Sequence, residues 1–111
     1  MKKNKLKEKY IKAIDDTVKL PEKDGNGILK YSVNIDSKGM IVRYSFAYIN
    51  FHLCTKDNGR VLGYDNCHGY HHRHFMGNEE KIDFINFEDI QNRFEAEWER
   101  LHEKVKKQKR R

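Results

Sequence analysis

The chain has 111 residues, of which 36% are charged and 37% hydrophobic. Six Phe, six Tyr and one Trp supply enough area for a small core, so the composition argues against full disorder. The sequence has no run of about 18 apolar residues, as a membrane span needs, and no apolar stretch after its Lys-rich start, as a secretory signal needs. We therefore expect one domain over residues 1–111, cytoplasmic and without membrane contact, with two reduced cysteines.

The positive charge is concentrated at the two ends of the chain. Residues 1–12 carry a net charge of +5 and residues 104–111 carry +6, whereas residues 13–103 carry −5. Basic ends are typical of proteins attracted to phosphate backbones, such as RNA or the ribosome, although they also keep small proteins soluble. The ends thus favour a nucleic-acid partner but supply no catalytic chemistry.

The first predicted element is a helix over residues 4–19. Its apolar residues recur every three or four positions, and Pro21 follows where a helix should end. These apolar residues are Leu6, Tyr10, Ile11, Ile14 and Val18.

From residue 28 the apolar period changes to two, which predicts a sheet over residues 28–85. Short turns separate the strands, among them Asn58-Gly59, a strong hairpin signal, and Gly77-Asn78 before the last strand. Neighbouring strands should therefore run antiparallel. The expected strands cover residues 28–35, 40–53, 60–65, 70–76 and 81–84.

A second helix is predicted over residues 87–105, where apolar residues are again spaced by three or four and Asn86 can cap the start. A basic tail follows over residues 104–111. The predicted fold class is α+β, an antiparallel meander of four to five strands with an N-terminal and a C-terminal helix packed on it.

Four of the six histidines fall within seven residues, at positions 68, 71, 72 and 74. If residues 70–76 form a strand, His72 and His74 share one face and lie about 7 Å apart, while His71 and Arg73 share the other. Asp65 ends the preceding strand and can orient one imidazole. Any chemistry of this chain is therefore expected here.

Three interpretations of the cluster stay open. The imidazoles can be an acid–base pair that takes a proton from a ribose 2′-hydroxyl and gives one to the leaving 5′-oxygen, with an arginine stabilising the charge. The His-x-His pair with Asp65 or His68 can bind a metal ion and leave one position open. The histidines can also form a polar hairpin whose side chains pair with Asp65, Glu79, Glu80 or a partner protein.

The segments Tyr64-Asp65-Asn66 and His71-His72-Arg73-His74 resemble the TumE family of toxin–antitoxin-associated proteins. Arg43-Tyr44-Ser45-Phe46 is also similar to the pattern of that family, so the resemblance covers about residues 28–100. It implies a small cytoplasmic toxin that is opposed by a neighbouring DNA-binding antitoxin.

We therefore expect the toxin of a toxin–antitoxin module, acting as an endoribonuclease without a metal or other cofactor. Candidate catalytic residues are Asp65, His71, His72 and His74, and candidate phosphate- or RNA-binding residues are Arg73, Arg43 and Arg60. Expected partners are RNA or the ribosome, an antitoxin protein and, as a further option, a second copy of the chain. The alternatives are a non-catalytic binding protein that acts through its His-rich hairpin, and a metal-dependent hydrolase.

Overall fold

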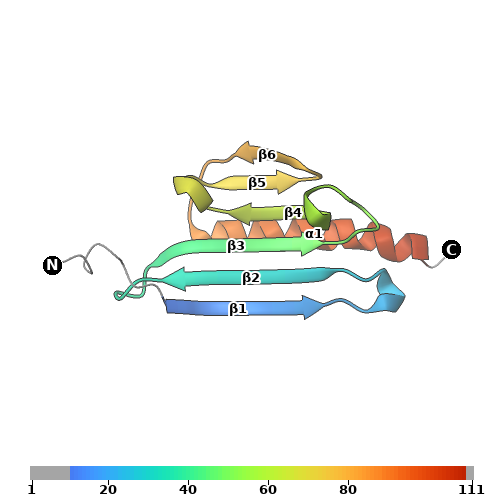
Figure 1. Ribbon diagram of the computed structural model, residues 1–111, viewed down its shortest axis with the longest axis horizontal. Helices are drawn as coiled ribbons and strands as arrows, with labels where there is room; N and C mark the ends of the chain where they lie inside the picture. Colours follow the sequence, from blue (N-terminus) through green and yellow to red (C-terminus); the bar gives the residue numbers. More distant parts are fainter. Residues whose placement is uncertain (1–10, 110–111) are drawn as a thin grey trace.

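Six antiparallel strands and one long helix make up the part of the chain that the computed structural model describes, residues 11–109 (Figure 1). The strands follow one another in the sheet in the order of the sequence, as in a meander. The elements are β1 (Ile11–Lys19), β2 (Ile28–Ile35), β3 (Ile41–Ile49), β4 (Arg60–Asp65), β5 (His72–Phe75), β6 (Asn78–Lys81) and α1 (Phe87–Lys109). The α+β class, the antiparallel meander and the C-terminal helix are thus confirmed.

The predicted N-terminal helix is wrong where the structure describes it, because residues 11–19 form β1; residues 4–10 of that prediction lie outside the described residues. An irregularity between Lys12 and Ile14 adds one residue to β1 relative to β2. Ile11, Ile14 and Val18 consequently oppose Ile35, Val33 and Leu29, three positions that share one face of β2. A bulged strand can thus place apolar residues three and four positions apart on one face, which imitates helical spacing.

The strand count is six rather than four to five, and three boundaries differ from prediction. β3 ends at Ile49, because the chain turns at Asn50, whose side-chain oxygen accepts from the backbone N–H of His52 at 2.9 Å. β5 covers only residues 72–75 of the predicted 70–76, and β6 lies at residues 78–81 instead of 81–84. The β5–β6 turn is at Met76-Gly77, both with positive φ, one residue earlier than the expected Gly77-Asn78.

The core lies between one face of the sheet and α1. Phe94 of α1 is fully buried and its ring meets those of Tyr31, Phe46 and Tyr64, with centroids 5.7, 5.6 and 6.4 Å apart. α1 is four residues longer than the predicted 87–105 helix, so residues 104–109 of the expected basic tail are helical. None of the helical segments between residues 11 and 109 combines the length and the hydrophobicity that a bilayer crossing requires.

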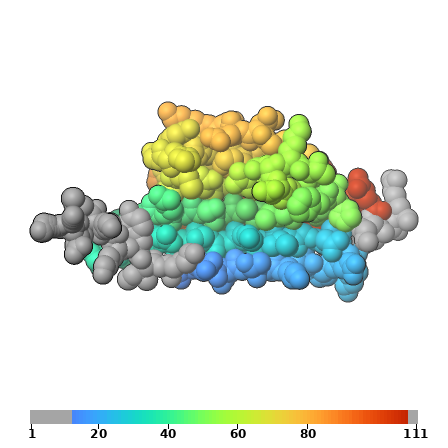
Figure 2. Space-filling model, viewed as in Figure 1, coloured from blue at the N-terminus to red at the C-terminus, as the bar shows by residue number. Residues whose placement is uncertain are grey.

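Within residues 11–109, no α-helix lies over the opposite face of the sheet (Figure 1). Figure 1 shows α1 behind the strands, and Figure 2 shows all the strands at the surface from this side. Strand alternation assigns residues to this open face: Ser45 of β3 is the partner of Asp65, and Ala47 is the partner of Gly63. We call this surface the open face of the sheet; the predicted site residues divide between it and the helix side.

A buried histidine makes the fold sensitive to acid. Asn50 donates to the hydroxyl of Tyr48 (3.1 Å), and the same hydroxyl is hydrogen-bonded to Nδ1 of His102 at 2.8 Å. Burial lowers the pKa of His102, and the positive charge of Lys106 lowers it further. His102 therefore binds a proton at a higher pH in the unfolded chain than in the folded chain. The free energy of unfolding should consequently decrease as the pH falls below about 6.5.

We expect the thermal midpoint of unfolding to fall between about pH 7.5 and pH 5.5, and to fall less in His102→Gln, whose carbonyl oxygen can still accept from Tyr48. Calorimetry at several pH values measures how steeply the thermal midpoint changes with pH in the parent chain and in the variant. The exposed His68 provides a control, since His68→Asn should keep the parental slope. If the thermal midpoint of His102→Gln depended on pH as steeply as that of the parent chain, His102 would not be the source of the acid sensitivity.

Candidate active site

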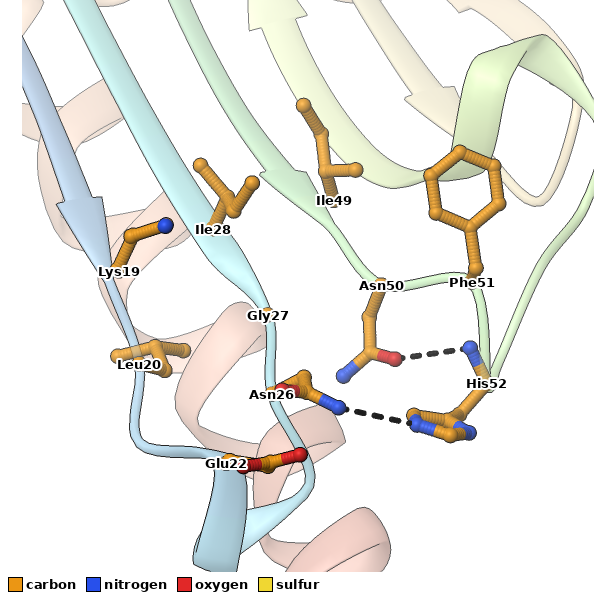
Figure 3. A pocket seen from close by; sticks show the side chains of 10 residues that line it. All are labelled: Lys19, Leu20, Glu22, Asn26, Gly27, Ile28, Ile49, Asn50, Phe51 and His52. Atoms are coloured by element: carbon orange, nitrogen blue, oxygen red, sulfur yellow. Dashed lines mark hydrogen bonds between the residues drawn. The ribbon is translucent and has the colours of Figure 1, made fainter.

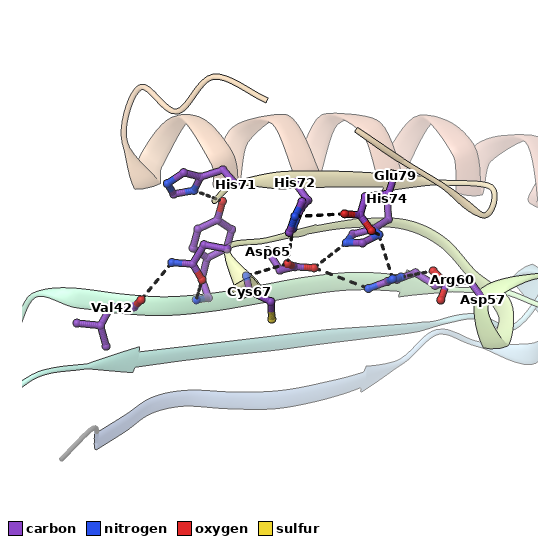
Figure 4. Close-up of polar contacts among 11 residues, drawn as sticks. Val42, Asp57, Arg60, Asp65, Cys67, His71, His72, His74 and Glu79 are labelled. Atoms are coloured by element: carbon purple, nitrogen blue, oxygen red, sulfur yellow. Dashed lines mark hydrogen bonds and ion pairs between the residues drawn. The ribbon is translucent and has the colours of Figure 1, made fainter. Parts of the chain in front are cut away.

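Strands β4 and β5 bring three of the four predicted catalytic residues, Asp65, His72 and His74, together on the open face (Figure 4). Asp65 is the direct partner of His72, and Gly63 is the partner of His74. Because side chains alternate along a strand, His72 and His74 lie on the same face as Asp65, as the sequence predicts. The intervening Arg73 points to α1 instead, where it meets Glu97.

The Asp65 carboxylate is the centre of the cluster, and the Asp65 side chain is 8% exposed. It accepts hydrogen bonds from Nδ1 of His72 at 3.1 Å, from Nε2 of His74 at 2.8 Å and from the backbone N–H of Cys67 at 3.0 Å. Burial raises the pKa of this carboxyl, but the His72 and Cys67 hydrogen bonds and the nearby His74 outweigh burial, so the net pKa is lowered. Asp65 is thus a buried anion that orients two imidazoles at once.

Arg60 determines where the proton of His74 lies. Nη2 of Arg60 is 3.1 Å from Nδ1 of His74, and a guanidinium can only donate, so this Nδ1 is the acceptor. The ring proton of His74 is then on Nε2, which donates it to Asp65. Asp57 holds the guanidinium in place through a 2.7 Å contact from its carboxylate to Nε. Arg60 was predicted as a phosphate-binding residue, and it lies beside His74, with Nη1 3.9 Å from the Asp65 carboxylate.

The second imidazole, His72, is 2% exposed. Its Nε2 lies 3.2 Å from Oε2 of Glu79, at ion-pair distance but without the alignment of a hydrogen bond. Among the described residues this buried nitrogen has no hydrogen-bond partner. The ring of Tyr70 covers the imidazole edge-on at a centroid distance of 3.9 Å. His72 therefore presents one nitrogen to Asp65 and directs the other away from it.

His71 lies apart from this cluster, on the helix side. Its Nδ1 is 2.9 Å from the hydroxyl of Tyr44, and its ring stacks on Phe84 at 4.0 Å. Burial lowers the pKa of His71, with a smaller effect of the same sign from the charge of His72. The structure thus gives His71 packing partners and separates it from the Asp65 carboxylate.

The two other predicted arginines also occupy different places. Arg43 is exposed and lies on the open face, two residues before Ser45, the partner of Asp65. Arg73 contacts both carboxylate oxygens of Glu97 in α1, at 2.8 and 3.3 Å, and Glu80 at 3.1 Å. Burial raises the pKa of Glu97, but Arg73 and Tyr64 lower it more, so Glu97 is charged and Arg73 ties the sheet to the helix.

Replacing Arg73 by methionine should therefore lower the free energy of unfolding by about 2 kcal/mol, because a half-buried Glu97 loses its charged hydrogen-bond partner. Urea titration measures this change. Arg43→Met is the matched control, since Arg43 is exposed and a change there should stay within about 0.5 kcal/mol. Equal losses in the two variants would contradict a structural role for Arg73.

Glu79 is the residue of this site that the sequence prediction named only as an acidic partner in the polar-hairpin interpretation, and not as a catalytic or phosphate-binding residue. It stands opposite His74 in the β5–β6 pairing, so its side chain is on the open face. The missed signal is the register of the hairpin, since strand pairing at residues 78–81 places Glu79 next to the imidazoles while pairing at 81–84 does not.

A pocket of about 550 Å³ lies on the same face at the end of β1, β2 and β3 (Figure 3). Ile28, Ile49 and Phe51 form apolar parts of its lining, and Asn26 contacts His52 at its rim at 3.3 Å. None of the predicted catalytic or phosphate-binding residues lines it. It is nevertheless close to the cluster, since Ile49 is the strand partner of Arg60.

The arrangement suits proton transfer next to an anion. One carboxylate fixes two imidazoles, whose ring centroids are 5.7 Å apart, and a guanidinium contacts one of them. Donor atoms of Asp65, His72 and His74 also lie within 4.8 Å of one another, so the same three residues could hold a metal ion.

Comparison with known families gives one result for this chain. The model of the family described as Toxin TumE matches residues 12–105, which include all of the candidate site. Comparisons with curated proteins and with solved structures find no match. Because the family match spans most of the sequence and the whole sheet from residue 12 onward, the chain belongs to the TumE family of toxins.

Proposed function

We propose that this toxin is an endoribonuclease whose acid–base pair is His72 and His74. The observation that carries the proposal is the hydrogen bonding of both imidazoles to one buried carboxylate, Asp65, with Arg60 beside His74. Two oriented imidazoles and a guanidinium can supply the general base, the general acid and the positive charge for cleavage of a phosphodiester by its own 2′-hydroxyl.

Each group has a role in the proposed reaction. Nδ1 of His74 is unprotonated in the contact with Arg60, so it suits the base that takes the proton of the 2′-hydroxyl. The 2′-oxygen then attacks phosphorus, and the bond from phosphorus to the 5′-oxygen breaks. His72, in its protonated form, gives that oxygen a proton from Nε2, and Arg60 stabilises the charge on phosphorus. The products are a 2′,3′-cyclic phosphate and a 5′-hydroxyl.

The open face supports RNA binding around this pair. Lys30 and Arg43 are exposed on β2 and β3, and strand alternation places both on the open face with Arg60. Such positive groups can follow a phosphate backbone. The 550 Å³ pocket that Ile28, Ile49 and Phe51 help to form lies at the same end of β3 as Arg60 and offers apolar surface to a base.

Membership in a toxin family implies an antitoxin as the partner of this chain. RNA as the substrate is part of our proposal, and the cytoplasmic location and association with a second copy stay predictions.

Incubation of the purified chain with a defined RNA tests the proposal. We expect cleavage that persists in excess EDTA and leaves 2′,3′-cyclic phosphate ends, because the reaction uses the 2′-hydroxyl and no metal. A matched RNA with a 2′-deoxyribose at the cleaved position should stay intact there. Growth inhibition in cells together with intact RNA would contradict the proposal and favour the non-catalytic binding protein.

A metal-dependent hydrolase is the second candidate, because donor atoms of Asp65, His72 and His74 lie within 4.8 Å of one another. A metal on Nε2 of His74 would require the ring proton on Nδ1, where Arg60 now donates, so the contact with Arg60 favours the metal-free site. Stoichiometric metal in elemental analysis, with activity lost in EDTA and restored by the ion, would support this candidate instead.

A further inference from the structure

The side chain of Glu79 lies where the outward nitrogens of both imidazoles meet. Its Oε2 is 3.2 Å from Nε2 of His72, and its Oε1 is 4.0 Å from Nδ1 of His74. These are the nitrogens that do not contact Asp65. The carboxylate of Glu79 and that of Asp65 therefore lie on opposite sides of the same two rings (Figure 4).

The surroundings of the Glu79 carboxylate are those of a binding site for an anion. Nε2 of His72 is buried without a hydrogen-bond partner among residues 11–109, so this nitrogen can still form a hydrogen bond with an acceptor that replaces the Glu79 carboxylate. Arg60 Nη2 lies 3.1 Å from the same nitrogen of His74 that Glu79 approaches. An oxyanion at this place can receive hydrogen bonds from an imidazolium and a guanidinium, as a phosphate does.

From this geometry we infer that Glu79 occupies the position of the scissile phosphate and blocks the site until it turns away. The inference rests on the proposed function, because it assigns the same imidazoles and the same arginine to the substrate. It adds a regulatory residue and defines the ligand class as a phosphate group. RNA then binds in competition with a carboxylate of the chain itself.

Glu79 can leave this position without unfolding the sheet. Its side chain is 50% exposed, and β6 is a four-residue edge strand whose side chains are all exposed. The strand is held through its backbone pairing with β5, which rotation of one side chain does not disturb. Glu80, its neighbour, differs in pointing to the helix side and pairing with Arg73.

The test compares Glu79→Gln with Glu80→Gln, using inorganic phosphate as the probe. The chemical shifts of the ring nitrogens of His72 and His74, followed by NMR during a phosphate titration, report binding without any need for catalysis. We expect Glu79→Gln to bind phosphate about tenfold more tightly than the parent chain, since a like charge is removed from the site, and Glu80→Gln to bind as the parent does. Glu79→Ala should show the same gain, which covers the case in which glutamine keeps the contact.

Two results would overturn the inference: parental affinity in both Glu79 variants, or an equal gain in Glu80→Gln, which would indicate a general effect of charge. Adding Arg60→Met to Glu79→Gln should remove the gain, and its persistence would also contradict the proposed site. If the Glu79 variants gain phosphate affinity but neither they nor the parent cleaves RNA, the ribonuclease proposal fails while Glu79 still blocks an anion site.

Discussion

Replacing His72 by asparagine and His74 by glutamine should abolish both RNA cleavage and growth inhibition, with a loss of at least about 10⁴-fold in cleavage rate, because general acid and general base each contribute about 10²–10⁴. The two replacements are chosen to preserve the fold. Asparagine can keep a donor close to Nδ1 of His72, and glutamine can keep one close to Nε2 of His74, the atoms that donate to Asp65. Neither amide can transfer a proton in the reaction.

Alanine at both positions is a harsher change, because it leaves Asp65 buried without its imidazole donors. The measurements are the rate of RNA cleavage, growth after induction and the thermal midpoint of the purified variant. His68→Asn is the control, as His68 is exposed and lies outside the Asp65 cluster. Full toxicity of the double variant at a parental thermal midpoint would remove His72 and His74 from the mechanism.

Phe94→Ala should lower the free energy of unfolding by about 3–5 kcal/mol, the largest effect on stability that we expect. The ring is fully buried and connects α1 to three aromatic side chains of the sheet, those of Tyr31, Phe46 and Tyr64. Its removal leaves a cavity between α1 and the sheet, and the two elements cannot move together far enough to fill it. Urea unfolding followed by circular dichroism measures the loss.

The control for this substitution is Ile85→Ala, because Ile85 is 72% exposed in the segment before α1. A change within about 0.5 kcal/mol is expected there. A loss below about 1 kcal/mol in Phe94→Ala would show that the contact between helix and sheet contributes little to stability, since so small a loss is close to the range of surface substitutions.

Local patterns in the sequence are sufficient to predict most of the meander and the C-terminal helix. Strand alternation also places His72 and His74 on one face with Asp65, because the side-chain period of a strand is two whatever the sheet around it. The convergence of two imidazoles on one carboxylate follows from a short connection between neighbouring strands, and such connections are visible in the sequence. The family resemblance rests on these same residues and is confirmed.

Three features were decided only by the tertiary structure. β1 became a strand because pairing with β2 accommodates a bulge, and the apolar spacing of residues 11–18 fits a helix equally well. Arg60 contacts His74 in the site, whereas Arg73 pairs with Glu97 of α1, because each long side chain pairs with groups on its own side of the sheet. Glu79 lies in the site because of the register of the β5–β6 hairpin, whose turn at Met76-Gly77 lies one residue from the predicted Gly77-Asn78. In each case the deciding contact is between strands or between sheet and helix, so it depends on the partner segment and not on the local pattern alone.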